Sequence, residues 1–410
     1  MPEFLELLPP PQALARMLER MPSTIEAEEV ETAQAFGRVT ALPILAPHPL
    51  PTFPRTTVDG YALRAADTYG AGESLPSYLA LAGEVPMGAA PDFGLQPGQC
   101  ALIHTGGMLP MGADAVVMIE YTQPARPREI EILRSVAVGE NVLKVGEDVA
   151  QDSMVIGAGT QLRPAEIGGL MALGITRLLV ARMPRIGLIS SGDEVVPPQA
   201  QIREGQVRDI NAYTLSALVQ SAGGVPVRYG IIPDKAEILQ AAAHQALSEC
   251  DAVVITAGSS ASTRDLTAQV IGELGTPGVL VHGVNVKPGK PTILAVCDGK
   301  AVIGLPGNPV SALVIARLFV VPVVERLLGL SEHKRHPSIA AKLALNLSSE
   351  SGREDWIAVR LVKEGDQMLA DPVFGKSNLI FSLARADGMV RIAADATGLA
   401  AGEKVEVILL

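Results

Sequence analysis

Apolar strand patterns alternate with amphipathic helix patterns between residues 184 and 330, and this is the clearest signal in the chain. Runs such as PRIGLISS and DAVVITAG are followed by helical patterns such as NAYTLSALVQSAG and LTAQVIGELG. This alternation is typical of a doubly wound α/β domain with a mainly parallel sheet. A strand pair around VLVHGVNV and PTILAVC, and the helix SALVIARLFVVPVVERLL, complete the predicted domain.

The rest of the chain shows different patterns. Residues 51–139 carry short β-prone runs broken by Gly and Pro, which predict an inserted β-rich domain. Residues 1–50 read as a helix followed by an extended Pro-rich segment, and we expect them to pack with residues 140–183 in a discontinuous mixed α/β domain. Residues 331–410 contain AKLALNL, DWIAVRLV and KVEVILL, which predict a small C-terminal β domain. The predicted fold class is therefore α/β multidomain.

Composition narrows the function classes. The 410 residues carry a formal net charge of −11, which argues against a dedicated nucleic-acid binder. Aromatic residues are only 3%, so platforms for stacking bases are scarce. An anionic ligand must therefore be held by local cations or by a metal ion.

The cysteines and the chain's apolar stretches point to a cytoplasmic protein with no membrane association. The amino-terminal MPEFLELLPPPQ lacks the basic region of a signal peptide. Residues 312–330 contain Arg317 and Glu325, which predict a buried helix rather than a membrane span. Three cysteines without paired spacing are expected to be buried free thiols: Cys100, Cys250 and Cys297.

Four polar loops follow strands of the predicted α/β sheet. Ligands of such sheets bind at the carboxyl ends of the strands, so we expect these loops to converge. Backbone N–H groups at the helix starts beyond them attract phosphates and oxyanions. The candidate residues are Ser190, Ser191, Gly192, Asp193 and Glu194; Asp234; Ser259, Ser260 and Asp265; and Pro306, Gly307, Asn308 and Pro309.

Three carboxylates in these loops would suit Mg²⁺. They are Glu194, Asp234 and Asp265, and Mg²⁺ prefers a few carboxylates together with phosphate oxygens of a substrate. Structural alternatives stay open at this point. Asp234 and Asp265 also fit the position of a helix N-cap, and LPGNP is consistent with a simple turn between strand and helix.

Positive charge is supplied by the segment VKPGKP. Lys287 and Lys290 lie on a loop that Pro and Gly constrain, which lowers the entropy cost of binding an oxyanion. The alternative is a solvated surface pair. Asp59 in TVDGYA and Asp148 in GED lie in predicted turns, where turn formation alone explains an acidic residue.

Six motifs in order resemble one known family. TVDGYA, HTGGMLPMGADAVVMIE, GENVLKVGEDV, SSGDEVV, VKPGKP and GLPGNPVSAL are similar to the signature series of the molybdopterin molybdenumtransferase family of the MoeA type, which includes the E domain of gephyrin. The resemblance runs from roughly residue 10 to residue 400.

The resemblance implies a four-domain homodimer that inserts molybdenum from molybdate into adenylylated molybdopterin. AMP is released, Mg²⁺ is required, and the pathway is molybdenum cofactor biosynthesis. Molybdopterin adenylyltransferase and recipient apoenzymes are the implied partners. The implied residues are Glu194, Asp234 and Asp265 for the metal; Asp59, Thr105 and Asp148 from other domains, across the dimer interface; and Lys287 and Lys290 for molybdate, with Ser311, Arg353 and Ser377.

Two segments depart from the family pattern. The loop AGSSASTRD stands where the family usually has a sequence close to GGVSVGDYD, and LKV replaces a commonly arginine-rich stretch before GED. Two alternatives therefore remain beside the transferase: a non-catalytic molybdopterin carrier and a tungstate-preferring paralogue. A gephyrin-like scaffold is a third class, for which the sequence nominates no partner surface.

Overall fold

A computed structural model of the chain describes residues 7–22, 26–257, 261–331 and 337–410; the side chains of residues 261–265 lie outside this description. Contacts divide the chain into two units. The first comprises Met1–Leu42, Ala158–Arg163 and Arg177–Leu410, and the second Pro43–Gly157 and Pro164–Thr176. The predicted four-domain boundaries are finer than this division and stay a prediction.

The first unit is built around a six-stranded sheet. In spatial order its strands are β16 (Val225–Ile232), β13 (Arg185–Ser191), β17 (Ala252–Ala257), β21 (Lys300–Pro306), β20 (Ile293–Cys297) and β18 (Pro277–His282). The first four run parallel, whereas β20 and β18 are antiparallel to their neighbours. The predicted α/β class and the mainly parallel sheet are confirmed.

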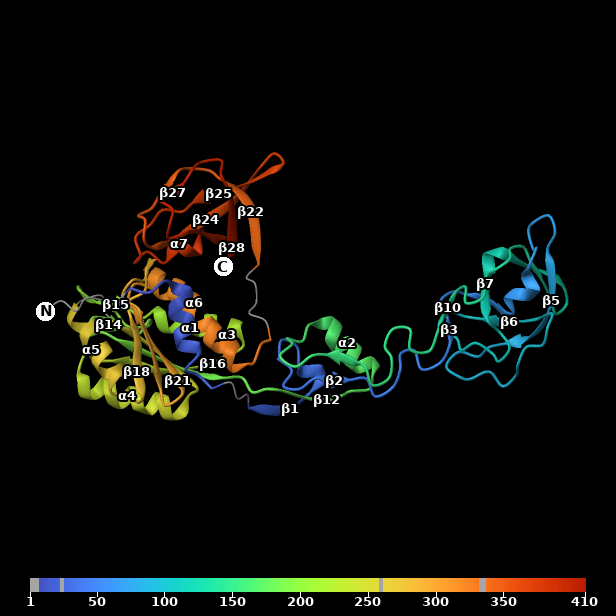
Figure 1. The fold of residues 1–410 in the computed structure, drawn as a ribbon, viewed down its shortest axis with the longest axis horizontal. Coiled ribbons are helices and arrows are strands. Elements are labelled where there is room, and N and C mark those ends of the chain that lie inside the picture. The colour runs from blue at the N-terminus through green and yellow to red at the C-terminus, as the bar shows by residue number, and fades with distance from the viewer. Residues whose placement is uncertain (1–6, 23–25, 258–260, 332–336) are drawn as a thin grey trace. The chain divides into compact units, whose positions relative to one another are not determined.

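Apolar side chains alternate between the two faces of this sheet. Ile186 of β13 and Val254 of β17 belong to one buried cluster, and Ile189 and Val253 to another. Successive strand residues point to opposite faces, so each face has its own core. Figure 1 shows the covering helices: α1 (Pro10–Leu18), α3 (Asn211–Ala222) and α6 (Pro309–Leu327) on the first core, α4 (Ala236–Glu249) and α5 (Ala261–Gly272) on the second.

The buried helix predicted from the most apolar stretch is α6, whose Ile315 and Phe319 are fully buried. No helix among the described residues has the length and apolar content that a membrane crossing requires. The helix α1 packs on the same core through Ala13 and Met17. The sequence pattern grouped residues 1–50 with residues 140–183. Residues 27–31 and 44–45 do pair with residues 177–181 and 154–156, whereas the apolar side chains of α1 meet the α6 side of the sheet.

The carboxyl-terminal strands form a closed ring. They are β22 (Ser338–Leu343), β24 (Glu354–Glu364), β25 (Gln367–Pro372), β26 (Gly388–Ile392) and β28 (Lys404–Leu409), with α7 (Phe381–Ala384) and the pair β23 (Leu347–Ser348) and β27 (Gly398–Leu399) beside them. The long β24 pairs with both β25 and β26, which closes the ring. The short strand β19 (Val286–Lys287) adds to β24 in parallel and ties the α/β sheet's lysine loop to this barrel.

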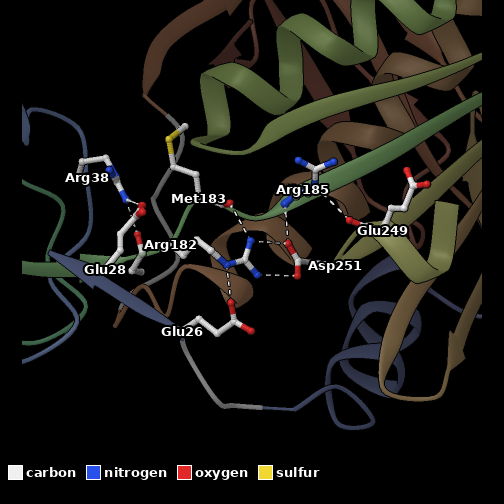
Figure 2. Close-up of polar contacts among 9 residues, drawn as sticks. Glu26, Glu28, Arg38, Arg182, Met183, Arg185, Glu249 and Asp251 are labelled. Atoms are coloured by element: carbon white, nitrogen blue, oxygen red, sulfur yellow. Dashed lines mark hydrogen bonds and ion pairs between the residues drawn. The ribbon is translucent and has the colours of Figure 1, made fainter. Parts of the chain in front are cut away.

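An antiparallel ribbon of β1 (Ala27–Glu31) and β12 (Arg177–Ala181) leads into β13. At its end Arg182 donates two hydrogen bonds to the Asp251 carboxylate, at 3.0 and 2.8 Å, and also pairs with Glu26 (Figure 2). Asp251 accepts a further bond from the Arg185 backbone N–H at 2.6 Å. Burial alone raises the pKa of Asp251, but these bonds outweigh it and hold the pKa below its usual range.

The second unit contains another six-stranded sheet. In spatial order its strands are β7 (Ala115–Met118), β4 (Gly60–Leu63), β6 (Gln99–Ile103), β5 (Ser77–Glu84), β9 (Glu129–Ile132) and β8 (Thr122–Arg126). TVDGYA is more than the predicted turn, because it runs into the internal strand β4. A Cβ on Gly60 would lie 1.9 Å from the Val117 carbonyl oxygen, so glycine is required there.

The remaining elements are short. The second unit also holds β2 (Ile44–Leu45) with β11 (Met154–Ile156), β3 (Arg55–Thr56) with β10 (Val142–Leu143), and α2 (Pro164–Ala172).

All three cysteines are buried and free, as predicted. Burial raises the pKa of Cys100 to about 12 and, with help from Asp298, that of Cys297 to about 11, so both thiols stay protonated.

Candidate active site

A crevice opens where the α/β sheet reverses its strand order. The strand β13 comes first in the chain, and the next two parallel strands, β16 and β17, pair on opposite sides of it. Such a switch point leaves space beyond the carboxyl ends of the strands. A cavity of about 370 Å³ lies there, and we call it the crevice. Six of its lining residues were predicted from sequence: Ser190, Ser191, Glu194, Gly307, Asn308 and Pro309.

The crevice also contains residues that sequence reasoning missed. Asp209 is buried, accepts a hydrogen bond from the Ser190 hydroxyl at 2.8 Å, and accepts another from the Ala212 N–H at 3.1 Å at the start of α3. Thr256 of β17 and Asn211 of α3 line the same cavity. The signal for Asp209 was its place just before the helical pattern NAYTLSALV, where an acidic residue can cap a helix.

Two predicted carboxylates lie beside the end of β13. The Ser191 hydroxyl donates a 2.6 Å hydrogen bond to Asp234, and the Asp234 N–H donates to Asp193 at 3.3 Å. The cap position of α4 is Lys235 and has no side-chain capping bond, so the Asp234 carboxylate does not cap this helix. A Cβ on Gly192 would lie 2.9 Å from a Glu194 carboxylate oxygen, which places Glu194 against the same short segment.

Asp234 and Glu194 supply carboxylate oxygens, the kind of ligand that Mg²⁺ accepts together with substrate oxygens and water. The third predicted ligand, Asp265, lies in α5, but its side chain is outside the described part of the structure, as are Ser259 and Ser260 entirely. Within the described residues, no group of three His, Cys, Asp or Glu side chains is arranged to hold a metal.

Hydrogen bonds and a close approach to α6 hold the loop of residues 286–291. Thr292, which is fully buried, donates a 2.6 Å hydrogen bond to the Gly289 carbonyl, and the Lys290 carbonyl accepts one from Val284 N–H at 2.9 Å. Gly289 has φ +119°, and a Cβ there would lie 2.2 Å from the Ile315 side chain of α6. The loop therefore fits against α6 only with glycine at this position.

A cavity of about 910 Å³ lies between this loop, the start of α6 and the carboxyl-terminal barrel, and we call it the cationic cavity. Among the described residues that line it, four are basic and one, Glu350, is a carboxylate. Asn308 lines both this cavity and the crevice, so the two adjoin there. The predicted residues on its wall are Lys287, Lys290, Pro306, Asn308, Ser311, Arg353 and Ser377; Lys376 was missed.

A buried carboxylate supports the basic residues. Asp355 is only 1% exposed, accepts a 2.9 Å hydrogen bond from the Arg353 Nε–H, and lies 4.0 Å from the Lys287 ammonium. The Arg353 Nη1 is 2.8 Å from Glu350. The family resemblance selected Arg353, but sequence reasoning missed Asp355 two residues later, because its contact with Lys287 depends on the pairing of β19 with β24.

The start of α6 joins the two cavities. Asn308 donates a 3.1 Å hydrogen bond to the Ser377 hydroxyl, and the Val310 N–H donates to the Ser377 carbonyl at 3.0 Å. Asn211 donates to the Gly307 carbonyl at 2.8 Å. LPGNP is thus more than a turn, since it connects the crevice to the barrel segment that carries Ser377.

Asp59 and Thr105 form a separate pair in the second unit. Asp59 accepts a 2.8 Å hydrogen bond from the Thr105 N–H and a 3.2 Å bond from its hydroxyl. These bonds, the backbone one first, hold the pKa of Asp59 below its usual range. Asp148 lies in the same unit and is exposed, and within the described residues it makes no side-chain contact with this pair.

Three family models match the chain in succession. They are the MoeA N-terminal region (domain I and II) over residues 8–174, a probable molybdopterin binding domain over residues 187–326, and the MoeA C-terminal region (domain IV) over residues 340–410. Apart from Leu7, the residues that line the two cavities lie in the part of the chain that the second and third models match.

Individual proteins are similar over most of their length. A molybdopterin molybdenumtransferase of a Nostoc species is 33% identical over 83% of this chain and 78% of its own, and one of Haemophilus influenzae is 30% identical over 97% of each. The crystal structure of a molybdopterin biosynthesis MoeA protein from Pyrococcus horikoshii OT3 is similar with TM-score 0.87 and 31% identity, over 99% of this chain and 100% of its own.

Proposed function

The chain belongs to the MoeA family, and on this premise we propose that it is a molybdopterin molybdenumtransferase of molybdenum cofactor biosynthesis. The proposed reaction transfers molybdenum from molybdate to adenylylated molybdopterin, releases AMP and requires Mg²⁺. The observation that carries this proposal is the cationic cavity. Residues that were predicted to bind an oxyanion line it, and it adjoins the crevice at Asn308.

The cationic cavity has the chemistry to bind molybdate, a small dianion. Lys287, Lys290 and Arg353 supply charge-assisted hydrogen-bond donors, which are stronger than neutral ones. The hydroxyls of Ser311 and Ser377 supply neutral donors on the same wall. This local positive field acts although the whole chain is acidic, because binding depends on the charges that line the cavity.

The crevice is the proposed place for the organic substrate, next to the oxyanion. Ser190, Ser191 and Asn308 would hold the pterin and phosphate groups there, and positioning two reactants side by side supplies much of the rate. Glu194 and Asp234 would hold Mg²⁺, with Ser191 fixing the Asp234 carboxylate. When bound, Mg²⁺ neutralises charge on the phosphate oxygens during cleavage of the AMP linkage.

We further propose that Asp59, Thr105 and Asp148 complete the site from the partner subunit of a homodimer. This assignment rests on the resemblance of their motifs, and the hydrogen bonds between Asp59 and Thr105 are consistent with a shared role. A cytoplasmic location, and exchange of substrate and product with molybdopterin adenylyltransferase and recipient apoenzymes, belong to the same proposal.

AMP release from adenylylated molybdopterin tests the function. We expect release that requires both Mg²⁺ and an oxyanion, and comparing molybdate with tungstate would identify the preferred metal. Glu194→Gln should slow release at least about 100-fold. Glu204→Gln, which changes an exposed glutamate that lines neither cavity, should match wild type. Tight pterin binding without AMP release from either oxyanion would indicate a carrier instead.

A further inference from the structure

We propose that Asp355 is a positioning residue for oxyanion binding: its buried carboxylate holds Arg353 and Lys287 at the wall of the cationic cavity. The inference rests on the proposed function, because it assumes that this cavity binds the oxyanion. Asp355 is absent from the lining of the cavity and acts through the two basic residues that line it.

Backbone pairing brings the three residues together. The strand β19 pairs in parallel with β24, with Val286 opposite Glu354 and Lys287 opposite Asp355. Asp355 thereby lies beneath the cavity wall with only 1% of its surface exposed. A buried carboxylate is costly unless cations and hydrogen-bond donors satisfy it, and Arg353 and Lys287 are the charged partners that the structure provides.

The contacts of Arg353 fix the plane of its guanidinium group. Nε–H binds Asp355 at 2.9 Å and Nη1 lies 2.8 Å from Glu350, so two carboxylates hold two edges of the fork. No contact of Nη2 is found among the described residues. A planar fork held at two points keeps its remaining donors in place, which reduces the side-chain entropy lost when an oxyanion binds.

The negative charge of Asp355 and its role as an anchor predict opposite effects of its removal on molybdate binding. As a negative charge near the cavity, Asp355 weakens the positive field, so on charge alone its removal would tighten molybdate binding. As the anchor of Arg353, its removal frees the guanidinium and weakens binding. Water and salt screen the charge effect in an open cavity, so we expect the loss of position to dominate.

Isothermal titration of the full-length protein with sodium molybdate measures the effect. We expect Asp355→Asn to raise the dissociation constant about tenfold, and Asp355→Ala to raise it further because no acceptor remains for Arg353. The matched control is Asp371→Asn on the neighbouring strand β25. The Asp371 carboxylate accepts a 3.2 Å hydrogen bond from Arg360, and neither residue lines a cavity, so the control should bind molybdate as wild type does.

Steady-state kinetics separate positioning from general damage. The Asp355 variants should raise KM for molybdate and leave KM for adenylylated molybdopterin unchanged, whereas a disturbed fold would change both. In a double-mutant cycle, Asp355→Asn should weaken molybdate affinity less in an Arg353→Ala background than in wild type, because only the contact with Lys287 remains to be lost. Independent, additive losses would overturn the inference.

Two further results distinguish the inference from the proposed function. If Arg353→Ala and Lys287→Ala weaken molybdate binding but the Asp355 variants do not, or bind more tightly, the positioning role is wrong and the oxyanion cavity stands. If neither Arg353→Ala nor Lys287→Ala changes molybdate binding, the cavity is not the oxyanion site, and the role of Asp355 is overturned with it.

Discussion

Asp251 lies where the β1–β12 ribbon enters the α/β sheet, and its carboxylate binds two parts of the chain. It accepts hydrogen bonds from both terminal nitrogens of Arg182 and from the backbone N–H of Arg185 (Figure 2). Glu26 extends this network to the start of the ribbon. The sequence predicted none of these contacts, because they join residues whose spacing carries no local pattern.

We predict that Asp251→Asn lowers the free energy of unfolding at pH 7 by about 2 kcal/mol, the scale of a hydrogen bond to a charged group. The pKa of Asp251 in the folded state lies below the unfolded value of about 3.9. The ion pair therefore stabilises the folded protein at higher pH, and this stabilisation is lost as the pH falls through the folded pKa. The difference between wild type and variant in urea unfolding should therefore shrink below about pH 4. Asp366→Asn, at an exposed position, is the control, and a difference unchanged at pH 3 would contradict this account.

Local motifs predicted those site residues whose role follows from their own loop. Lys287 and Lys290 were accessible to sequence reasoning because Pro and Gly around them indicate a rigid turn. Asp355 and Lys376 were not, because their importance depends on which segments meet at the cavity. Contacts such as that of Asp355 with Lys287, which form through strands distant in sequence, leave no such local signal.

At the scale of elements, the structure indicates that packing of the 286–291 loop against α6 positions the lysines. We predict that Gly289→Ala raises the molybdate dissociation constant at least about tenfold, because the added Cβ collides with Ile315 and φ +119° strains an L-residue. Gly299→Ala provides the control. Its φ is +83° and its nearest contact, Pro22, is 3.7 Å away, so it introduces backbone strain without the collision. Wild-type affinity in both variants would show that this packing does not hold the lysines.

Element prediction succeeded where one periodicity dominates. The alternating strands and helices of residues 184–330 and the β-prone runs of residues 51–139 were found from their patterns. It was less complete for β4 and β19. The strand β4 consists of four small or apolar residues after a turn, and β19 of only two residues. Neither strand is long enough to show the alternation of apolar and polar residues that marks a strand.

At the scale of the whole molecule, the proposed homodimer makes a test by complementation possible. Asp59 and Lys287 belong to different units, and Asp59→Asn or Lys287→Ala alone should reduce AMP release. If one subunit supplies Asp59 to the cavity of its partner, mixed dimers contain one intact site, and a random mixture of subunits should recover about a quarter of wild-type activity.

The control mixture combines Asp59→Asn with Thr105→Val, two changes in the same unit that cannot complement each other in this way. Native mass spectrometry would verify that mixed dimers form. Mixed dimers of the first pair without any recovered activity would show that the site is not shared between subunits.

In the proposed reaction, the cationic cavity holds the oxyanion whose metal is transferred. Anomalous diffraction from crystals grown with tungstate is the first test. Tungstate has nearly the size and charge of molybdate, and the anomalous scattering of tungsten marks its position in the map. We expect a tungsten peak bounded by Lys287, Lys290 and Arg353. A strong peak elsewhere, with this cavity empty, would contradict it.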